Sequence, residues 1–232
     1  GRPHTTKRFA GILLAVAMLL QPAAGVFAQQ VIPFTQFGDP VLHWNAIALQ
    51  TNAVDHTGTF GAPQQGGPGR SSRALAMSQG AVYDAVNSIY RTHEPLIALV
   101  PYQSNAPVSL DAAVATAAYR TLMHLHSLQH AYLNSEYQRF MASIPAGQAK
   151  NLGVSIGQAA ATNMINSRAN DGSDVVPPYV YSNQPGRHRV DPMNTGQPAF
   201  MGMGWGRVRY FVSNFRFTFT PPPALNSPQY TE

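Results

Sequence analysis

The segment Pro68–Tyr90 constrains the fold of this chain more than any other stretch. Its larger apolar residues recur at spacings of three, four and seven, which fit one face of a helix and not a strand: Leu75, Val82, Val86 and Ile89. The neighbouring positions are small: Ala74, Ala76, Ser78, Gly80, Ala81 and Ala85. We therefore expect a central helix that other helices approach closely, with Ser71 or Ser72 capping its N-terminus. Nothing in the segment is typical of a catalytic motif.

Further segments with helical periodicity predict an all-α fold built as a helical bundle: Val41–Gln50, Leu110–Leu125, Ala131–Ile144 and Ala146–Ala169. Asp39 before Pro40 is the N-cap pattern for the first of them, and Ser109 is the expected N-cap of the second. Gly153 and Gly157 predict a place where another helix touches the backbone of the last one. Trp44 is expected in the core.

The character of the chain changes near residue 176. From there to residue 232 the sequence is rich in proline and aromatic residues and has no sustained helical period, so we expect a long irregular C-terminal arm. Val208–Phe219 alternates imperfectly, which predicts a short strand. We expect the arm to wrap the helices and to pack against them through its rings, because structureless loops of this length are unusual in a compact domain.

The N-terminus has the pattern of a secretory signal. Lys7 and Arg8 precede an apolar run, Phe9–Leu20, and small residues lead up to Ala28, where we expect cleavage. A retained N-terminal anchor is the alternative. The expected organisation is a signal peptide over 1–28, a helical domain over 29–175 and the arm over 176–232. The product is expected to be exported, periplasmic or extracellular, with no membrane span after cleavage.

Charge and cysteine content exclude several classes of protein. The formal charge of +5 falls to +2 when Arg2, Lys7 and Arg8 leave with the signal, which gives no support to a nucleic-acid partner. The chain has no cysteine, so it has no disulfide framework.

Two groups of residues are candidates for a catalytic site or a metal site. Asp55 and His56 are adjacent in a loop and could be half of a catalytic dyad, but no nucleophile can be tied to them from the sequence. His126 and His130 would share a face of an unbroken helix and could chelate a metal, whereas His124 would point elsewhere. The alternative is a solvated or hydrogen-bonded helix end. The sequence assigns no catalytic, cofactor-binding or metal-binding residue.

Several segments, taken in order, resemble a known family. They are the segment 68–90, SLDAAVATAAYRTLMHL (109–125), GVSIGQAAATNMINSRANDGS (153–173), PGRHRVDPMNTGQPAFMGMGWGRVRYFV (185–212) and FTPPPALNSPQY (219–230). Together they look like the N-terminal half of bacterial vanadium-dependent haloperoxidase-related proteins, which share a superfamily with the type 2 phosphatidic acid phosphatases. The resemblance implies an all-α fold and an enzyme that holds vanadate or phosphate. Its substrates would be halide and peroxide, or a phosphoester.

The family's catalytic set is a Lys and an Arg, then Ser-Gly-His, then an Arg followed by a His, and it does not match this sequence. Lys150 is the one lysine after the signal, and no Ser-Gly-His occurs. Arg187-His188-Arg189 falls in the family's pre-catalytic loop and is expected to be an exposed basic loop. The resemblance therefore implies the scaffold part of an enzyme, with the chain expected to continue beyond Glu232 into a catalytic half. The alternatives are a non-catalytic exported helical protein that binds a partner through its aromatic arm, or an acid phosphatase relative.

Overall fold

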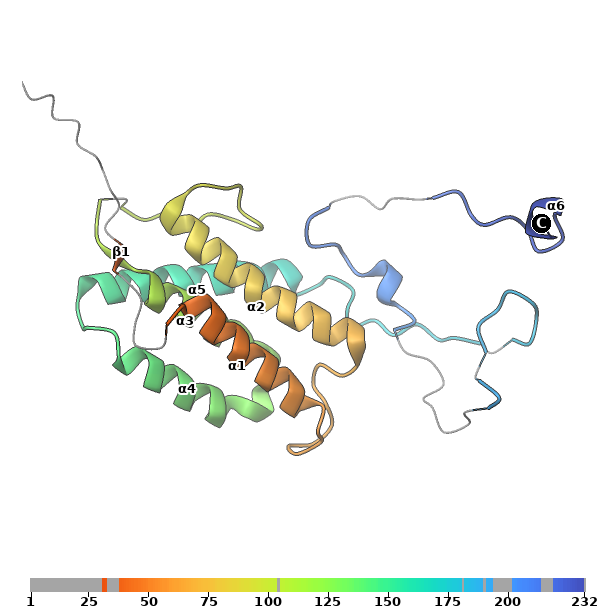
Figure 1. Cartoon of the computed structure of the whole chain (residues 1–232), viewed down its shortest axis with the longest axis horizontal. Coiled ribbons are helices and arrows are strands. Elements are labelled where there is room, and N and C mark those ends of the chain that lie inside the picture. Colours follow the sequence, from red (N-terminus) through yellow and green to blue (C-terminus); the bar gives the residue numbers. More distant parts are fainter. Residues whose placement is uncertain are drawn as a thin grey trace, which may run out of the picture.

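The computed structural model describes residues 31–32, 38–103, 105–180, 182–189, 191–193, 202–213 and 219–231. In this part of the chain a bundle of long helices is followed by an extended irregular segment (Figure 1). The long helices are α1 (Pro40–Asp55), α2 (Gly67–Tyr90), α3 (Leu110–Leu125), α4 (His130–Ala142) and α5 (Gln148–Arg168). The predicted all-α fold is confirmed. Helix α1 continues to Asp55, beyond the predicted end at Gln50, so the prediction that Asp55 lies in a loop is wrong. The expected signal over 1–28 lies outside the described residues.

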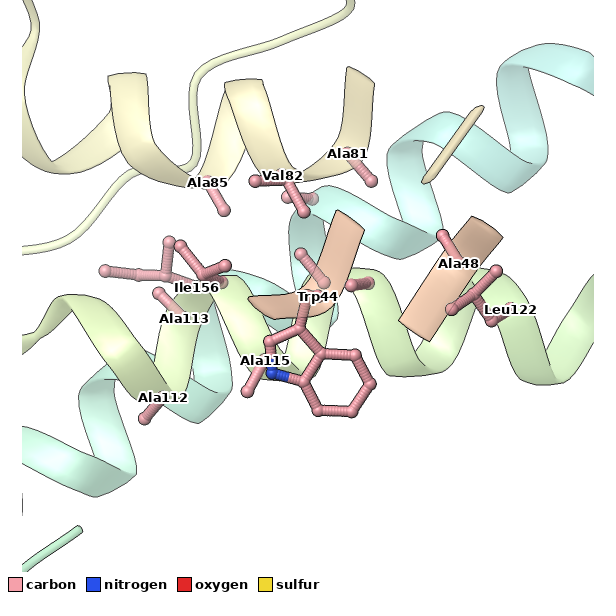
Figure 2. Close-up of a cluster of buried hydrophobic side chains, with 14 of the residues drawn as sticks. Trp44, Ala48, Ala81, Val82, Ala85, Ala112, Ala113, Ala115, Leu122 and Ile156 are labelled. Atoms are coloured by element: carbon pink, nitrogen blue, oxygen red, sulfur yellow. The ribbon is translucent and has the colours of Figure 1, made fainter. Parts of the chain in front are cut away.

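Helix α3 is the centre of the bundle, in place of the predicted α2, and contacts α1, α2, α4 and α5. Its position follows from its composition, because small residues cover most of its surface and every residue from Leu110 to Ala118 is buried. Trp44 of α1 is fully buried against this helix, as the sequence predicts (Figure 2). Its indole meets Tyr137 and Phe140 of α4 edge to face, which closes the core on that side.

Helices α3 and α5 touch backbone to backbone through the predicted glycines. A Cβ atom on Gly153 would lie 2.3 Å from the carbonyl oxygen of Ser109, and one on Gly157 would lie 2.3 Å from that of Ala113. These distances leave no room for a side chain. The sequence-based prediction of close approach at both glycines is confirmed.

The helix ends show which capping predictions hold. Asp39 accepts hydrogen bonds from the backbone N–H groups of Val41 and Leu42, at 2.8 and 3.1 Å, and Ser109 caps α3 as expected. The capping prediction for α2 is wrong, because that helix begins earlier, after Gly66, and has no side-chain cap. Ser71 and Ser72 lie inside it and donate to the carbonyl oxygens of Gln65 and Pro68.

Two short strands and a buried carboxylate hold the segments that precede and follow the helices against the bundle. β1 (Val31–Ile32) pairs in parallel with β2 (Val108–Ser109), directly before α3. Asp84 of α2 is 1% exposed and accepts hydrogen bonds from three backbone N–H groups of the loop that follows its helix: Leu96, Ile97 and Ala98. This carboxylate holds the proline-containing loop, residues 91–107, against the bundle.

The C-terminal arm extends away from the helices, so the prediction that it wraps them is wrong for most of its described residues (Figure 1). Contact with the bundle is concentrated in residues 202–211, which include the short 3-10 helix η2 (Trp205–Arg207). Tyr179 and Phe219 are exposed. The predicted strand is absent over 208–213, and the rest of it, 214–218, lies outside the described residues. A last short helix, α6, spans Pro228–Thr231.

None of the helices in the described part of the chain has the length and apolar character needed to cross a membrane.

Candidate functional site

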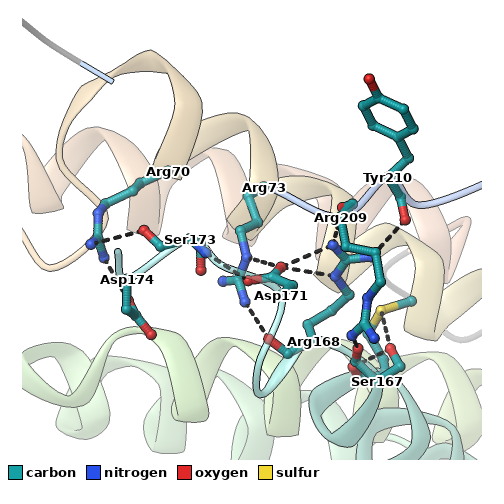
Figure 3. Close-up of polar contacts among 10 residues, drawn as sticks. Arg70, Arg73, Ser167, Arg168, Asp171, Ser173, Asp174, Arg209 and Tyr210 are labelled. Carbon is teal, nitrogen blue, oxygen red and sulfur yellow. Dashed lines mark hydrogen bonds and ion pairs between the residues drawn. The ribbon is translucent and has the colours of Figure 1, made fainter. Parts of the chain in front are cut away.

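The richest polar cluster of the described structure lies where the arm leaves the bundle, and we call it the arginine junction. Its charged members come from the first turns of α2, the C-terminal end of α5 and the arm: Arg70, Arg73, Arg168, Asp171, Asp174 and Arg209 (Figure 3). The cations outnumber the carboxylates, so the junction carries a net positive charge.

Asp171 is the hub of the junction. Its side chain is 1% exposed, and its Oδ2 accepts from Arg73 Nε at 2.7 Å and from Arg168 Nε at 3.0 Å. Its Oδ1 accepts from the backbone N–H of Ser173 at 3.0 Å. The carboxylate thus joins α2 to the C-terminal end of α5 by charge-assisted hydrogen bonds, which are among the stronger polar contacts in proteins.

These contacts set the protonation of Asp171. Burial by itself raises the pKa of this carboxyl, but hydrogen bonds from Arg73 and Ser173 outweigh burial and hold the pKa at about 2, below the ordinary value of 3.8. Asp171 is therefore ionised at every pH at which the protein is expected to work.

Arg168 connects the junction to the arm. Its side chain is 3% exposed and donates to the carbonyl oxygens of Arg209 and Tyr210, the latter at 2.9 Å. Its guanidinium lies 4.3 Å from the ring centroid of Phe211, a cation–π contact. The backbone N–H of Arg209 donates to the carbonyl oxygen of Asp171 at 2.8 Å. Segment 209–211 is thereby fixed to α5.

Two cavities flank Trp205 beside the junction. The larger, about 410 Å³, is bounded by the uncapped start of α2, by Arg70 and by apolar residues of the arm, including Val176 and Met203. The smaller, about 320 Å³, lies between α2 and segment 208–211. The indole of Trp205 packs directly on Gly69, where a Cβ atom would come within 2.5 Å of the ring. The described residues lining both cavities include no histidine, cysteine or carboxylate, so the cavities offer binding surface and no acid–base pair.

The structure separates Asp55 from His56. Asp55 is buried and accepts from the backbone N–H groups of Gln64 and Gln65, at 2.9 and 2.8 Å. His56 is exposed, and its Nδ1 lies 2.8 Å from the carbonyl oxygen of Asn52, which makes this nitrogen the donor. The two adjacent residues do not form a dyad.

Ser71 approaches His56 in space, with its Oγ 3.2 Å from His56 Nε2. The same hydroxyl also lies 3.0 Å from the carbonyl oxygen of Gln65, to which it can donate instead. No motif in the sequence predicts this contact.

His126 and His130 do not share a helix face, because the chain does not form one unbroken helix through both of them. Helix α3 ends at Leu125, a short 3-10 helix (Ser127–Gln129) follows, and α4 starts at His130. His130 Nε2 lies 2.7 Å from the carbonyl oxygen of Met123, and His124 is exposed. No cluster of three or more His, Cys, Asp or Glu side chains suited to a metal ion is present in the described part of the chain.

His126 is buried at this break, and its Nδ1 has no hydrogen-bond partner among the described residues. Burial lowers the pKa of His126 below 6.5, and the Asp55 carboxylate, 3.9 Å from Nδ1, opposes part of that effect. Because the folded-state pKa is depressed, the unfolded chain binds the proton first as the pH falls below about 6.5.

The free energy of unfolding is therefore expected to decrease from pH 7 towards pH 5, by at most about 1.4 kcal/mol per pH unit for this one proton. Urea titrations at several pH values measure this pH dependence of the free energy of unfolding, and His126→Gln should make the dependence flatter. His124→Gln, at an exposed histidine of the same region, should leave the profile unchanged. A profile equally steep in His126→Gln and in the unaltered chain would contradict the assignment.

The structure also shows the environment of the other basic residues that the sequence analysis considered. Lys150 Nζ donates to the carbonyl oxygens of Met141 and Ile144, at 2.7 and 3.3 Å, and so caps the C-terminal end of α4. Arg187-His188-Arg189 is an exposed loop, as expected.

The sequence alone does not identify the residues of the arginine junction. No motif in the sequence marks Asp171, and Arg73 is separated from it by almost a hundred residues. The available signal was an arginine, Arg168, three residues before an aspartate at a helix end, which is common on protein surfaces.

Comparison with protein families identifies the family of this chain. The family described as "Vanadium chloroperoxidase N-terminal domain" matches residues 36–199, which include all five long helices and the first part of the arm. Comparisons with curated proteins and with solved structures gave no significant match.

Proposed function

This chain belongs to the family of vanadium chloroperoxidase N-terminal domains, and we propose that it is the helical scaffold of an exported, vanadium-haloperoxidase-like enzyme. The observation that carries the proposal is the family match over residues 36–199, which spans the whole bundle and reaches Arg168 and Asp171 of the arginine junction. Small-molecule substrates, halide and peroxide, follow from the family. Export is proposed from the signal pattern before Ala28 and would be tested by mass spectrometry of the secreted product.

The family implies vanadate, and the described residues do not fit it. A vanadate site needs cationic donors directed at an oxyanion together with a histidine. In the arginine junction the guanidinium groups of Arg73 and Arg168 donate to Asp171 and to backbone carbonyls instead. No histidine lines the neighbouring cavities among the described residues. We therefore assign the oxyanion chemistry to a catalytic part outside these residues.

We propose that the described part of the chain positions the arm relative to the helical bundle. The arginine junction fixes where the arm leaves the bundle, because Asp171 links α2 to the end of α5 while Arg168 holds Tyr210 and Phe211. A catalytic part that follows the arm would then start from a defined point on the scaffold.

The activity test compares this chain with the full translation product of its gene. We expect the 232-residue chain to show no vanadate-dependent bromide oxidation and no phosphatase activity. The full product should show vanadate-dependent oxidation if it contains the Lys…Arg, Ser-Gly-His and Arg…His series. Activity of the 232-residue chain alone would contradict the scaffold role, and phosphatase activity alone in the full product would favour the acid phosphatase relative.

A second candidate, a non-catalytic exported binding protein, is favoured by one observation. The described arm exposes apolar side chains, among them Val180, Val212 and Phe219, each more than 80% exposed. These side chains are accessible to a partner, and exposed apolar residues that gather into a contiguous patch mark interaction sites. Reading the gene past the codon for Glu232 separates the candidates: a stop codon there favours binding, and an open frame carrying the catalytic series favours the scaffold.

A further inference from the structure

The arm returns to the bundle at the place where it leaves it. The backbone N–H of Arg209 donates to the carbonyl oxygen of Asp171 at 2.8 Å. Nearby, a Cβ atom on Gly204 would lie 2.4 Å from the carbonyl oxygen of Val175, so these two backbones touch. The residues between these contacts therefore form a loop, 178–203, whose two ends are held together. We call the paired segments at its base, which carry these four residues, the stem.

The 178–203 loop projects away from the helices (Figure 1). All residues from 183 to 189 are exposed. Local hydrogen bonds order this part, because the backbone N–H of Arg187 donates to Gln184 at 3.1 Å and the Tyr179 hydroxyl donates to His188 at 3.0 Å, in each case to the carbonyl oxygen. Exposed irregular segments are where proteases nick a folded chain, since a few residues can become extended without unfolding the core.

We propose that Arg187-His188-Arg189 is a processing site for an endoprotease that cleaves after arginine, and that the cut protein stays assembled as two pieces. Such a protease binds the arginine side chain in an acidic pocket. The exposed segment 183–189 suits it, because this segment contains two arginines and no carboxylate. Hydrolysis consumes one water molecule. A cut after Arg187 breaks the bond from its carbonyl carbon to the nitrogen of His188, and leaves a carboxylate on Arg187 and an amino group on His188.

The other basic residues of the described structure are less accessible to a protease. Each of them lies in an α-helix or a 3-10 helix, at the C-terminal end of α2, or in the stem. Arg120 is exposed but lies inside α3. Arg209 lies in the stem, and Arg168 and Asp171 engage its backbone carbonyl and N–H groups. Cleavage at such positions requires the helix or the stem to open first, which makes it slower.

The arginine junction holds the second piece after the cut. Arg168 belongs to the first piece and contacts the carbonyl oxygen of Arg209 and the ring of Phe211 in the second. Trp205 of the second piece packs on Gly69 of the first. All these contacts lie outside the 178–203 loop, so hydrolysis within the loop leaves them in place.

Limited digestion of the full chain with trypsin, followed by mass spectrometry, tests the site. Between residues 38 and 213, the first cut is expected after Arg187 or Arg189, about tenfold faster than after any other lysine or arginine. The double variant Arg187→Gln/Arg189→Gln should lose this cut. The matched control, Arg120→Gln, removes an exposed arginine of a helix and should keep it. A first cut elsewhere in this range would overturn the proposal.

Gel filtration of the digested protein tests whether it stays assembled. The two pieces should elute together in native buffer and separate in urea. Trp205→Ala removes the contact with Gly69 and should raise the released fraction of the small piece by about tenfold. Val212→Ala, at a side chain that is 86% exposed, should release no more than the unaltered protein. Separation of the unaltered pieces in native buffer, or equal release from both variants, would overturn the two-piece assembly. If Trp205→Ala fails to fold, as judged by circular dichroism, the elution of the unaltered protein still decides.

Mass spectrometry of the protein isolated from the cells that produce it tests whether the site is used. Chains that end at Arg187 or Arg189 are expected, together with the matching second piece. Recovery of the uncut chain alone would overturn the processing proposal. It would leave the proposed scaffold role untouched, because that role is tested separately by the activity of the full product.

Discussion

Replacing Gly157 with alanine is expected to lower the free energy of unfolding by about 2 kcal/mol, although alanine is the better helix former by about 1 kcal/mol. The reason is the contact between α5 and α3. A Cβ atom at this position would lie 2.3 Å from the carbonyl oxygen of Ala113 and 2.8 Å from Thr116 Cβ. Neither atom can move without shifting the central helix, which packs against every other long helix of the bundle.

Urea denaturation followed by far-ultraviolet circular dichroism measures this effect. The control is Gly206→Ala, because a Cβ atom there would have no heavy atom within 4 Å, and a change within about 0.5 kcal/mol is expected. A Gly157→Ala protein at least as stable as the unaltered chain would contradict the backbone contact between α3 and α5.

Replacing Asp171 with asparagine is expected to destabilise the protein by about 3 kcal/mol or more, the usual cost of removing one partner from a buried ion pair. The substitution leaves Arg73 and Arg168 without their carboxylate, and Arg168 is almost fully buried. We also expect segment 209–211 to loosen, because Arg168 holds it and is itself oriented by Asp171. Thermal unfolding reports the stability, and proteolysis after Arg209 reports the loosening.

The matched control is Asp174→Asn. Asp174 pairs with Arg70 at 3.2 Å, but its side chain is 81% exposed, and such pairs contribute little. Acid supplies an independent check. Because the pKa of Asp171 in the folded protein, about 2, lies below the ordinary 3.8, its contribution of about 2 kcal/mol is present above pH 4 and is lost as the pH falls through 2. Equal effects of the two substitutions would contradict the role of Asp171 as the hub.

The helices of the bundle could be predicted from the sequence because their signals are local. Asp39, Pro40 and Ser109 mark helix starts, and the structure places the caps there. Gly153 and Gly157 predicted a close helix contact, since their missing side chains matter in any packing. The prediction failed at Ser71 and Ser72, because Pro68 and an uncapped Gly66 start the helix earlier than the serine signal.

The candidate site could not be predicted, because its contacts join distant parts of the chain. Arg73 and Asp171 meet only after α2 and α5 have packed side by side, and no spacing in the sequence records that. The aromatic arm was expected to cover the helices, yet most of its described residues lie away from them. Composition reports that rings prefer burial, but it does not say against which surface.

The sequence by itself determined the approximate positions of the long helices, the caps of α1 and α3, and the two glycines of α5 at which another helix can approach closely. Each of these signals depends on residues within a few turns of one another. Only the tertiary structure decided that Asp171 joins two arginines, that His126 is buried at a helix break and that no described segment covers the outer face of α1. These properties depend on which helix faces meet, and that is set by the packing of the whole bundle.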